Sequence, residues 1–220
     1  MKNKDIFTFR DAEKQAGPVA FSTMLKPAGS ACNLDCHYCY YLDKAVQYGG
    51  KQAVMSDELL ELYVRQYIEA NDVDTVQFCW HGGEPLLLGV DFYRRAMDFQ
   101  QKYADGKRIE NTLQTNGTLV DEAWCDLFAG NNFLVGISLD GPQDIHDAFR
   151  LTKGGRPTFE RVMQTIGMFQ RSGVEYNTLS VVNRLCEGRG GEIYRFFRDT
   201  VHSRYMQFLP AVEHVVDKPG

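Results

Sequence analysis

The sequence has few of the features that mark membrane, secreted or nucleic-acid-binding proteins. No apolar run approaches the roughly 18 residues of a transmembrane helix, and the polar start MKNKDIFTFRDAEKQ has no apolar segment typical of a secretory signal. The net charge is -5 and Lys and Arg form no run, which disfavours binding to nucleic acid or anionic lipid. We therefore expect a cytoplasmic protein with no membrane and no nucleic-acid partner.

The usual nucleotide-binding loops are also missing. No GxGxxG follows the first apolar run, and no Walker phosphate loop occurs anywhere in the chain. The composition is otherwise ordinary, because 220 residues with 44% hydrophobic side chains are enough to bury a substantial core. We expect one globular domain at residues 19–220, preceded by a polar lead at residues 1–18.

Cysteine is the unusual feature of this sequence. Cys32, Cys36 and Cys39 fall within eight residues, in CNLDCHYC. Soft thiolates at such spacing bind iron-sulfur clusters, zinc or copper, and a cubane cluster usually takes four of them. With only three local thiolates, one iron would stay open to a small molecule. The other cysteines are expected to pack in the core as small hydrophobes: Cys79, Cys125 and Cys186.

A zinc site is the alternative for these thiols, with His37 as a further ligand. Zinc sites more often pair a CxxC with a second ligand pair about 12 to 20 residues later. No CxxC or HxxxH follows in this chain. A disulfide framework fits less well, because the chain has no secretory signal and its remaining cysteines are scattered.

Apolar patterning predicts alternating strands and helices. Strands are expected at residues 19–25, 74–80, 109–115, 133–139, 174–182 and 205–209, and helices at residues 56–70, 91–103, 121–128, 158–172 and 192–199. This alternation predicts an α/β fold with a parallel sheet and helices packed outside it. A βα barrel, complete or partial, is favoured over an open doubly wound sheet.

Unusual residues follow the predicted strands. The cysteines come after the first strand, HGGEP (81–85) after the second, QTNG (114–117) at the end of the third and SLDGP (138–142) at the end of the fourth. Leu209 and Pro210 end the sixth. Ligands of both candidate folds bind at the carboxyl ends of parallel strands, so we expect these residues on one rim.

The cysteine motif resembles that of a known superfamily. CxxxCxxC with Tyr38 before the last cysteine and Tyr40 after it is similar to the signature of radical S-adenosylmethionine (SAM) enzymes. The resemblance implies a partial (β/α)6 TIM-like barrel and a 4Fe-4S cluster on the three cysteines. It also implies that the open iron binds the amino and carboxylate groups of SAM, and that one electron cleaves SAM to a 5′-deoxyadenosyl radical.

The same resemblance implies a set of SAM contacts, with Tyr38 among the cofactor-binding residues. The GGE motif would meet the ammonium group of SAM, Ser138 would use its hydroxyl, Arg150 would pair with the SAM carboxylate, and Leu209 would lend backbone to the adenine. The GGE motif is Gly82, Gly83 and Glu84.

Each of these residues also has a local interpretation. Gly82-Gly83 is an ordinary turn signal, the Ser138 hydroxyl could be satisfied by backbone, and Arg150 could be solvated or paired with Asp147. A lone His81 is more often structural. Asn116-Gly117 is first a tight turn, with a supporting role in the pocket.

A closer resemblance covers most of the chain. KPxxxACNLxCxYCYY, WHGGEPLL, LQTNGTLVD, VGISLDGPxxIHDxxR and MQFLP together resemble the anaerobic sulfatase-maturating enzymes. This implies oxidation of a Cys or Ser in a sulfatase polypeptide to Cα-formylglycine without oxygen. The reaction would begin with hydrogen abstraction from the target Cβ, and loss of an electron and a proton would give a thioaldehyde or aldehyde. An electron donor such as flavodoxin or ferredoxin is implied as a partner.

Enzymes of that family also carry a C-terminal cysteine-rich SPASM domain with two auxiliary clusters and an Asp base. No cysteine follows Cys186 here. We therefore expect that domain and the substrate base to lie beyond residue 220, so no catalytic base is assigned in this chain. Two alternatives stay open, namely a SPASM-type enzyme that modifies another ribosomal peptide and a non-catalytic zinc module.

Overall fold

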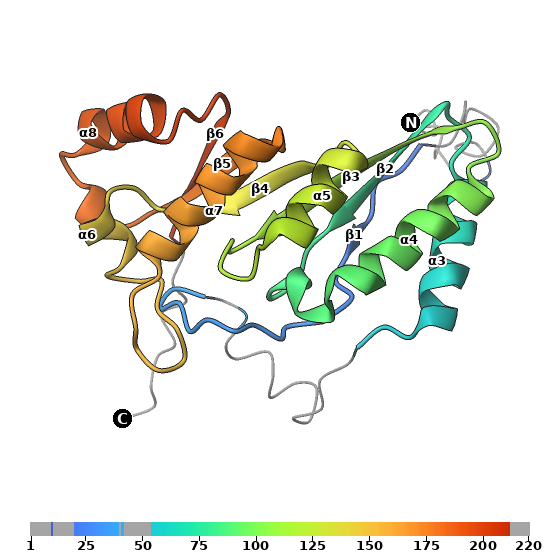
Figure 1. The fold of residues 1–220 in the computed structure, drawn as a ribbon, viewed down its shortest axis with the longest axis horizontal. Helices are drawn as coiled ribbons and strands as arrows, with labels where there is room; N and C mark the ends of the chain where they lie inside the picture. The colour runs from blue at the N-terminus through green and yellow to red at the C-terminus, as the bar shows by residue number, and fades with distance from the viewer. Residues whose placement is uncertain (1–9, 11–19, 40, 42–53, 212–220) are drawn as a thin grey trace, which may run out of the picture.

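The computed structural model describes residue 10 and residues 20–39, 41 and 54–211. Its centre is a sheet of six strands in sequence order, each parallel to the next (Figure 1). The strands are β1 (Met24–Leu25), β2 (Thr75–Trp80), β3 (Arg108–Thr115), β4 (Leu134–Ser138), β5 (Glu175–Val182) and β6 (Met206–Pro210). A doubly wound sheet reverses its strand order at a central strand, and this sheet does not. The predicted partial barrel is confirmed.

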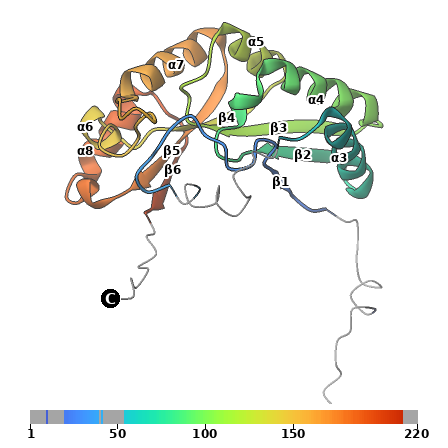
Figure 2. The ribbon, with the colours of Figure 1, turned by 90° about the horizontal axis from the view of Figure 1, so that it is seen from below.

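Helices cover one face of this sheet. They are α3 (Asp57–Ala70), α4 (Val90–Tyr103), α5 (Glu122–Gly130), α6 (Gln143–His146), α7 (Phe159–Ser172) and α8 (Gly190–Arg195), with short turns η1 (Pro85–Leu88) and η2 (Arg184–Cys186). Figure 2 shows the described helices arching over the convex face, while no described helix covers the concave face. The sequence missed α6, and the helix predicted at residues 192–199 ends instead in a π-helical turn, η3 (Phe196–Thr200).

The helix boundaries follow from capping residues. The Ser56 side chain accepts a hydrogen bond from Leu59 N and so begins α3, and Asp121 does the same for α5 through Trp124 N. Gly173 ends α7 with a φ of 70°, a conformation that glycine adopts without strain. The four longer helices therefore lie within about two residues of their predicted bounds.

The core lies between the sheet and its helices, because the side chains of each strand alternate between the two faces. In β2, Val76, Phe78 and Trp80 are buried under the helices. Cys125 and Cys186 are buried as expected, but Cys79 is only half-buried. Its position between Phe78 and Trp80 directs it to the concave face, so the prediction of a core Cys79 is wrong.

The first strand is shorter than predicted. Only Met24 and Leu25 pair with β2, opposite Cys79 and Trp80. The preceding residues bond instead to the helix layer, where Phe21 N donates to Asn71 Oδ1 at 3.0 Å. Residues 1–18, the predicted polar lead, lie outside the described residues except for residue 10.

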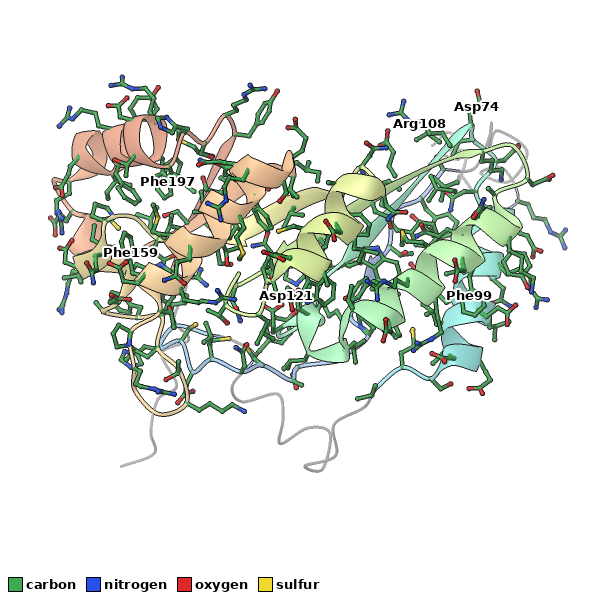
Figure 3. The ribbon with its side chains drawn as sticks, viewed as in Figure 1. Asp74, Phe99, Arg108, Asp121, Phe159 and Phe197 are labelled. Carbon is green, nitrogen blue, oxygen red and sulfur yellow. The ribbon has the colours of Figure 1, made fainter. Side chains whose placement is uncertain are left out.

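The two ends of the strands differ in what lies beside them. At the amino ends, Arg108 N donates to Asp74 O at 2.8 Å, and Figure 3 shows these two residues together at one end of the sheet. The segment from Cys32 to Cys39, called the cysteine segment below, crosses the opposite ends of the strands, which are their carboxyl ends (Figure 1). Within the described part of the chain, no helix has the length and apolar character needed to cross a membrane.

Candidate functional site

The cysteine segment is attached to a loop more than a hundred residues away in the chain. Asp35 N donates to Leu151 O at 2.8 Å, and His37 N donates to Phe149 O at 3.0 Å. Leu34 also forms an antiparallel bridge with Thr152. This pairing holds the segment against the loop that follows β4, and no local sequence pattern indicates it.

The three cysteines lie within electrostatic range of one another, with Cys36 buried and the other two half-buried. Burial raises the pKa of Cys32, and it raises the pKa of Cys36 to about 12 although the Arg150 charge opposes the shift. Two donors approach Cys32 Sγ, namely Leu34 N at 3.4 Å and Asn116 Nδ2 at 3.8 Å. Such donors suit a thiolate that acts as a ligand.

These thiols do not form a compact site for a single ion. Zn–S bonds are about 2.3 Å, so the sulfurs around one zinc ion lie about 3.8 Å apart. Among the described residues, no group of three or more His, Cys, Asp or Glu side chains is arranged to hold a metal ion. Soft thiolates that receive N–H donors, as Cys32 does, are the usual ligands of an iron-sulfur cluster.

Two glycines allow a close approach between the segment and the end of β2. A Cβ on Gly83 would lie 2.2 Å from Ala31 O, and one on Gly82, whose φ is +136°, would lie 2.9 Å from Gly29 O. Gly83 N donates to Gly29 O at 3.0 Å. Backbone of the GGE motif is thus held beside the cysteines at a distance that only glycine permits.

His81, the residue before these glycines, has a local role. Its Nδ1 accepts a hydrogen bond from Gly82 N at 2.8 Å, and its side chain is half-buried. This contact agrees with the structural interpretation of His81.

Glu84 connects two of the segments that form the rim. The side chain is fully buried, and Oε1 accepts hydrogen bonds from Leu86 N at 3.0 Å and Thr115 Oγ1 at 2.8 Å. Oε2 accepts from Asn116 N at 2.8 Å. The carboxylate therefore joins the loop after β2 to the end of β3.

Asp140, which was not among the predicted site residues, organises the other side of the rim. Its fully buried carboxylate accepts a hydrogen bond from the Tyr38 hydroxyl and one from Val181 N at 3.0 Å. It also forms an ion pair with Arg150, whose Nε lies 3.1 Å from Oδ2. The only signal in the sequence was its place directly after a buried strand.

Arg150 is therefore neither solvated nor paired with Asp147. Its side chain is 8% exposed, and its guanidinium lies over the Tyr38 ring at 5.5 Å. Asp147 instead caps α7, accepting hydrogen bonds from Thr158 N and Phe159 N. Both local alternatives for Arg150 are wrong, and this buried cation lies at the edge of the cysteine segment.

Ser138 has a side-chain partner rather than the backbone partner of its local interpretation. Gln114 Nε2 donates to Ser138 Oγ at 3.1 Å, across the strand boundary between β3 and β4. Gly136 makes room for this contact, because a Cβ there would lie 2.1 Å from Gln114 Oε1. Gln114 was quoted in the QTNG motif but was given no role.

Leu209 lies on the last strand and is 45% exposed. Its register partner on β5 is Val181, whose N–H bonds to Asp140. The structure thus brings all the described candidate residues to the carboxyl ends of the strands. Tyr40 lies outside the described residues.

A separate pocket of about 370 Å³ lies between the end of α7 and the start of β5, with His202 and Arg204 in its lining. None of the candidate residues lines it. It is at the amino end of β5, so it is not part of this site.

Comparison with known families matches residues 27–186 to the Radical SAM superfamily. Among curated proteins, the chain is 47% identical over 194 residues to a serine-type anaerobic sulfatase-maturating enzyme of Bacteroides thetaiotaomicron, covering 88% of this chain and 47% of that protein. It is 41% identical over 201 residues to a cysteine-type anaerobic sulfatase-maturating enzyme of Clostridium novyi, covering 90% of this chain and 53% of that protein. The chain spans about half the length of these relatives.

Solved structures give the same result. Native anSMEcpe with bound AdoMet and Kp18Cys peptide matches with a TM-score of 0.82 and 35% identity, over 90% of this chain and 53% of that one. Streptococcus suis SuiB matches with a TM-score of 0.62 and 17% identity, over 88% of this chain and 40% of that one, which shows a shared fold.

The buried Glu84 carboxyl group should make the free energy of unfolding depend on pH. Burial raises its pKa from 4.5 to about 7 despite three hydrogen bonds, so folded protein holds a proton that unfolded protein releases between these values. The contribution of Glu84 to stability is therefore fully present below pH 4.5 and is lost as pH rises through 7. The loss amounts to about 3 kcal/mol.

Urea unfolding of the apoprotein at several pH values checks this. Glu84→Gln should flatten the fall between pH 5 and 8, whereas Glu110→Gln, on the exposed side of β3, should keep it. Equal slopes for the parent protein and Glu84→Gln would show that Glu84 is not the group responsible.

Proposed function

This chain belongs to the radical SAM superfamily, and we propose that it provides the SAM-binding domain of an anaerobic sulfatase-maturating enzyme. Such an enzyme oxidises a Cys or Ser of a sulfatase polypeptide to Cα-formylglycine without oxygen. The observation that carries the proposal is 47% identity to a serine-type maturase along 88% of this chain. The TM-score of 0.82 to anSMEcpe with AdoMet and a peptide supports it independently.

In this proposal Cys32, Cys36 and Cys39 bind a 4Fe-4S cluster, and SAM binds its open iron. When bound, the cluster and SAM supply a 5′-deoxyadenosyl radical through one-electron cleavage of SAM. The role of the polypeptide is to hold the three thiolates on a segment with a fixed conformation. The backbone bonds of that segment to Phe149 and Leu151 serve this role.

Arg150 is proposed to bind the SAM carboxylate. Asp140 holds the guanidinium from its Nε side, which leaves the two terminal nitrogens as a fork for a second carboxylate. Tyr38 supports this arrangement, because its ring packs against the face of the guanidinium and its hydroxyl donates a hydrogen bond to Asp140. Its role is thus to position Arg150 in the cofactor site.

The remaining SAM contacts are assigned by geometry. Because Gln114 donates to the Ser138 oxygen, the Ser138 hydroxyl hydrogen is left to donate to SAM. Backbone of Gly82 and Gly83 would meet the SAM ammonium, while Glu84 holds that backbone in place. Leu209, at the end of the sixth strand, is proposed to lend its backbone to the adenine.

The concave face of the sheet is proposed to receive the sulfatase polypeptide. No described helix covers it (Figure 2), and uncharged polar side chains alternate with the buried ones along its strands. Amide groups of this kind pair with the backbone of an extended peptide. The side chains are Gln77, Thr112, Gln114, Asn177 and Gln207.

An electron donor of the flavodoxin or ferredoxin class and a cytoplasmic location complete the proposal. The substrate base is expected outside the half of the maturases that this chain matches. It is therefore not assigned to any residue here.

The cluster assignment predicts that each of Cys32→Ala, Cys36→Ala and Cys39→Ala loses the cluster, because each removes one of only three thiolate bonds. Anaerobic reconstitution followed by iron analysis and 5′-deoxyadenosine quantification measures this. The parent protein and the control variant Cys79→Ala should keep the cluster, about four irons. Reductive SAM cleavage by the triple variant would contradict the assignment.

The Arg150 assignment predicts that Arg150→Ala weakens SAM binding at least about tenfold, roughly 1.4 kcal/mol, with unchanged iron content. The loss should be much smaller for decarboxylated SAM, which lacks the carboxylate. Arg189→Ala removes a half-buried arginine that pairs with Asp144 and Glu192 away from the cysteines, and it serves as the control. An equal loss for both ligands would remove Arg150 from carboxylate binding.

The maturase activity predicts conversion of a peptide copied from a sulfatase active site. The full-length protein, loaded with cluster and supplied with SAM and dithionite, is incubated with peptides that carry either Cys or Ser at the target position. Cα-formylglycine, detected by mass spectrometry, should form in at least one of them together with 5′-deoxyadenosine. Deoxyadenosine with no change in either peptide would favour a relative that modifies another ribosomal peptide.

A further inference from the structure

The side chain of Asn116, at the end of β3, reaches the cysteine segment. Its Nδ2 lies 3.8 Å from Cys32 Sγ and 2.9 Å from Asn33 Oδ1. The Asn116-Gly117 pair predicts a tight turn with a supporting role in the pocket. The contact with sulfur gives it a more direct one.

The orientation of the Asn116 amide is set by its neighbours. Its Oδ1 accepts hydrogen bonds from Thr118 N at 2.9 Å and from Thr118 Oγ1 at 2.7 Å. A backbone N–H can only donate, so the amide oxygen must face Thr118 and the amide nitrogen must face the cysteine segment.

A closed ring of hydrogen bonds holds this orientation. Asn116 Nδ2 donates to Asn33 Oδ1, Asn33 Nδ2 donates to Thr118 Oγ1 at 2.8 Å, and Thr118 Oγ1 donates back to Asn116 Oδ1. One of the two protons on Asn116 Nδ2 is used by Asn33. The other is left for Cys32 Sγ.

The backbone beneath this ring is also fixed. Asn116 N donates to the buried Glu84 carboxylate at 2.8 Å, and Gly117 N donates to Thr115 Oγ1 at 3.0 Å. Asn116 itself is only 8% exposed. The side-chain N–H group of Asn116 is therefore held toward the sulfur, in surroundings from which water is largely excluded.

We propose that Asn116 is a positioning residue that raises the reduction potential of the cluster through its N–H···S hydrogen bond to Cys32. The inference rests on the proposed function, because it requires a cluster on Cys32. A reduced cluster carries one more negative charge than an oxidised one, so a donor aimed at its thiolate stabilises the reduced form more. The bond makes the cluster easier to reduce.

Asn116→Ala is the direct test, since it removes the donor and keeps the backbone bond to Glu84. The full-length protein is reconstituted with iron and sulfide, and the midpoint potential is measured by redox titration of the EPR signal that changes when SAM is added. We expect a shift to more negative potential with unchanged iron content. A potential equal to that of the parent protein would overturn the inference.

Thr118→Val is the matched control. It breaks two bonds of the ring but leaves the Asn116 amide and its backbone anchors, so it should produce only a small part of the shift. An equal shift in Thr118→Val and Asn116→Ala would show that loosening of the turn, rather than the N–H···S bond, changes the potential.

Asn116→Asp decides the question if Asn116→Ala does not assemble a cluster. It keeps an oxygen for the Thr118 donors and replaces the amide nitrogen by a carboxylate oxygen, so the potential should again fall. A potential that stays the same or rises would overturn the inference. If the parent protein forms no SAM-responsive cluster, the proposed function itself fails, which is a distinct outcome.

Discussion

The rim of this partial barrel depends on two buried carboxyl groups that join segments from different parts of the chain. Asp140 accepts hydrogen bonds from Tyr38 of the cysteine segment and from Val181 of β5, and it forms an ion pair with Arg150 in the loop after β4. Glu84 accepts hydrogen bonds from Leu86 in its own loop and from Thr115 at the end of β3. A buried carboxyl group without hydrogen-bond partners costs several kcal/mol when it is charged and less when it is protonated, so each of the two favours the one arrangement in which its donors converge.

These two carboxylates hold different parts of the proposed cofactor site. Glu84 fixes the glycine backbone that approaches Ala31, and it also anchors Asn116 beside Cys32. Asp140 fixes Tyr38, which lies between two of the cysteines, and orients Arg150. The cysteine segment is therefore held on one side by the contacts of Glu84 and on the other by those of Asp140. The groups proposed to bind SAM take part in the same contacts.

The sheet supplies the frame on which this rim is built. Its parallel register sets all six strand ends on one edge, and the helices bury one face of it. Every second side chain points away from the helices, which places polar residues such as Gln77 and Gln114 on the concave face. Gly136 shows how closely that face is packed, since its missing side chain is what allows Gln114 to reach Ser138.

The sequence by itself determined the order of the elements, because apolar periodicity and capping residues such as Ser56 and Asp121 act over a few neighbouring residues. It also predicted the cluster ligands, since Cys32, Cys36 and Cys39 share one short segment. Only the tertiary structure decided the partners of Arg150 and Glu84, the face of Cys79 and the contact of Asn116 with sulfur. These depend on which strand ends meet, and residues such as Tyr38 and Asp140 are separated by about a hundred positions that carry no local record of their pairing.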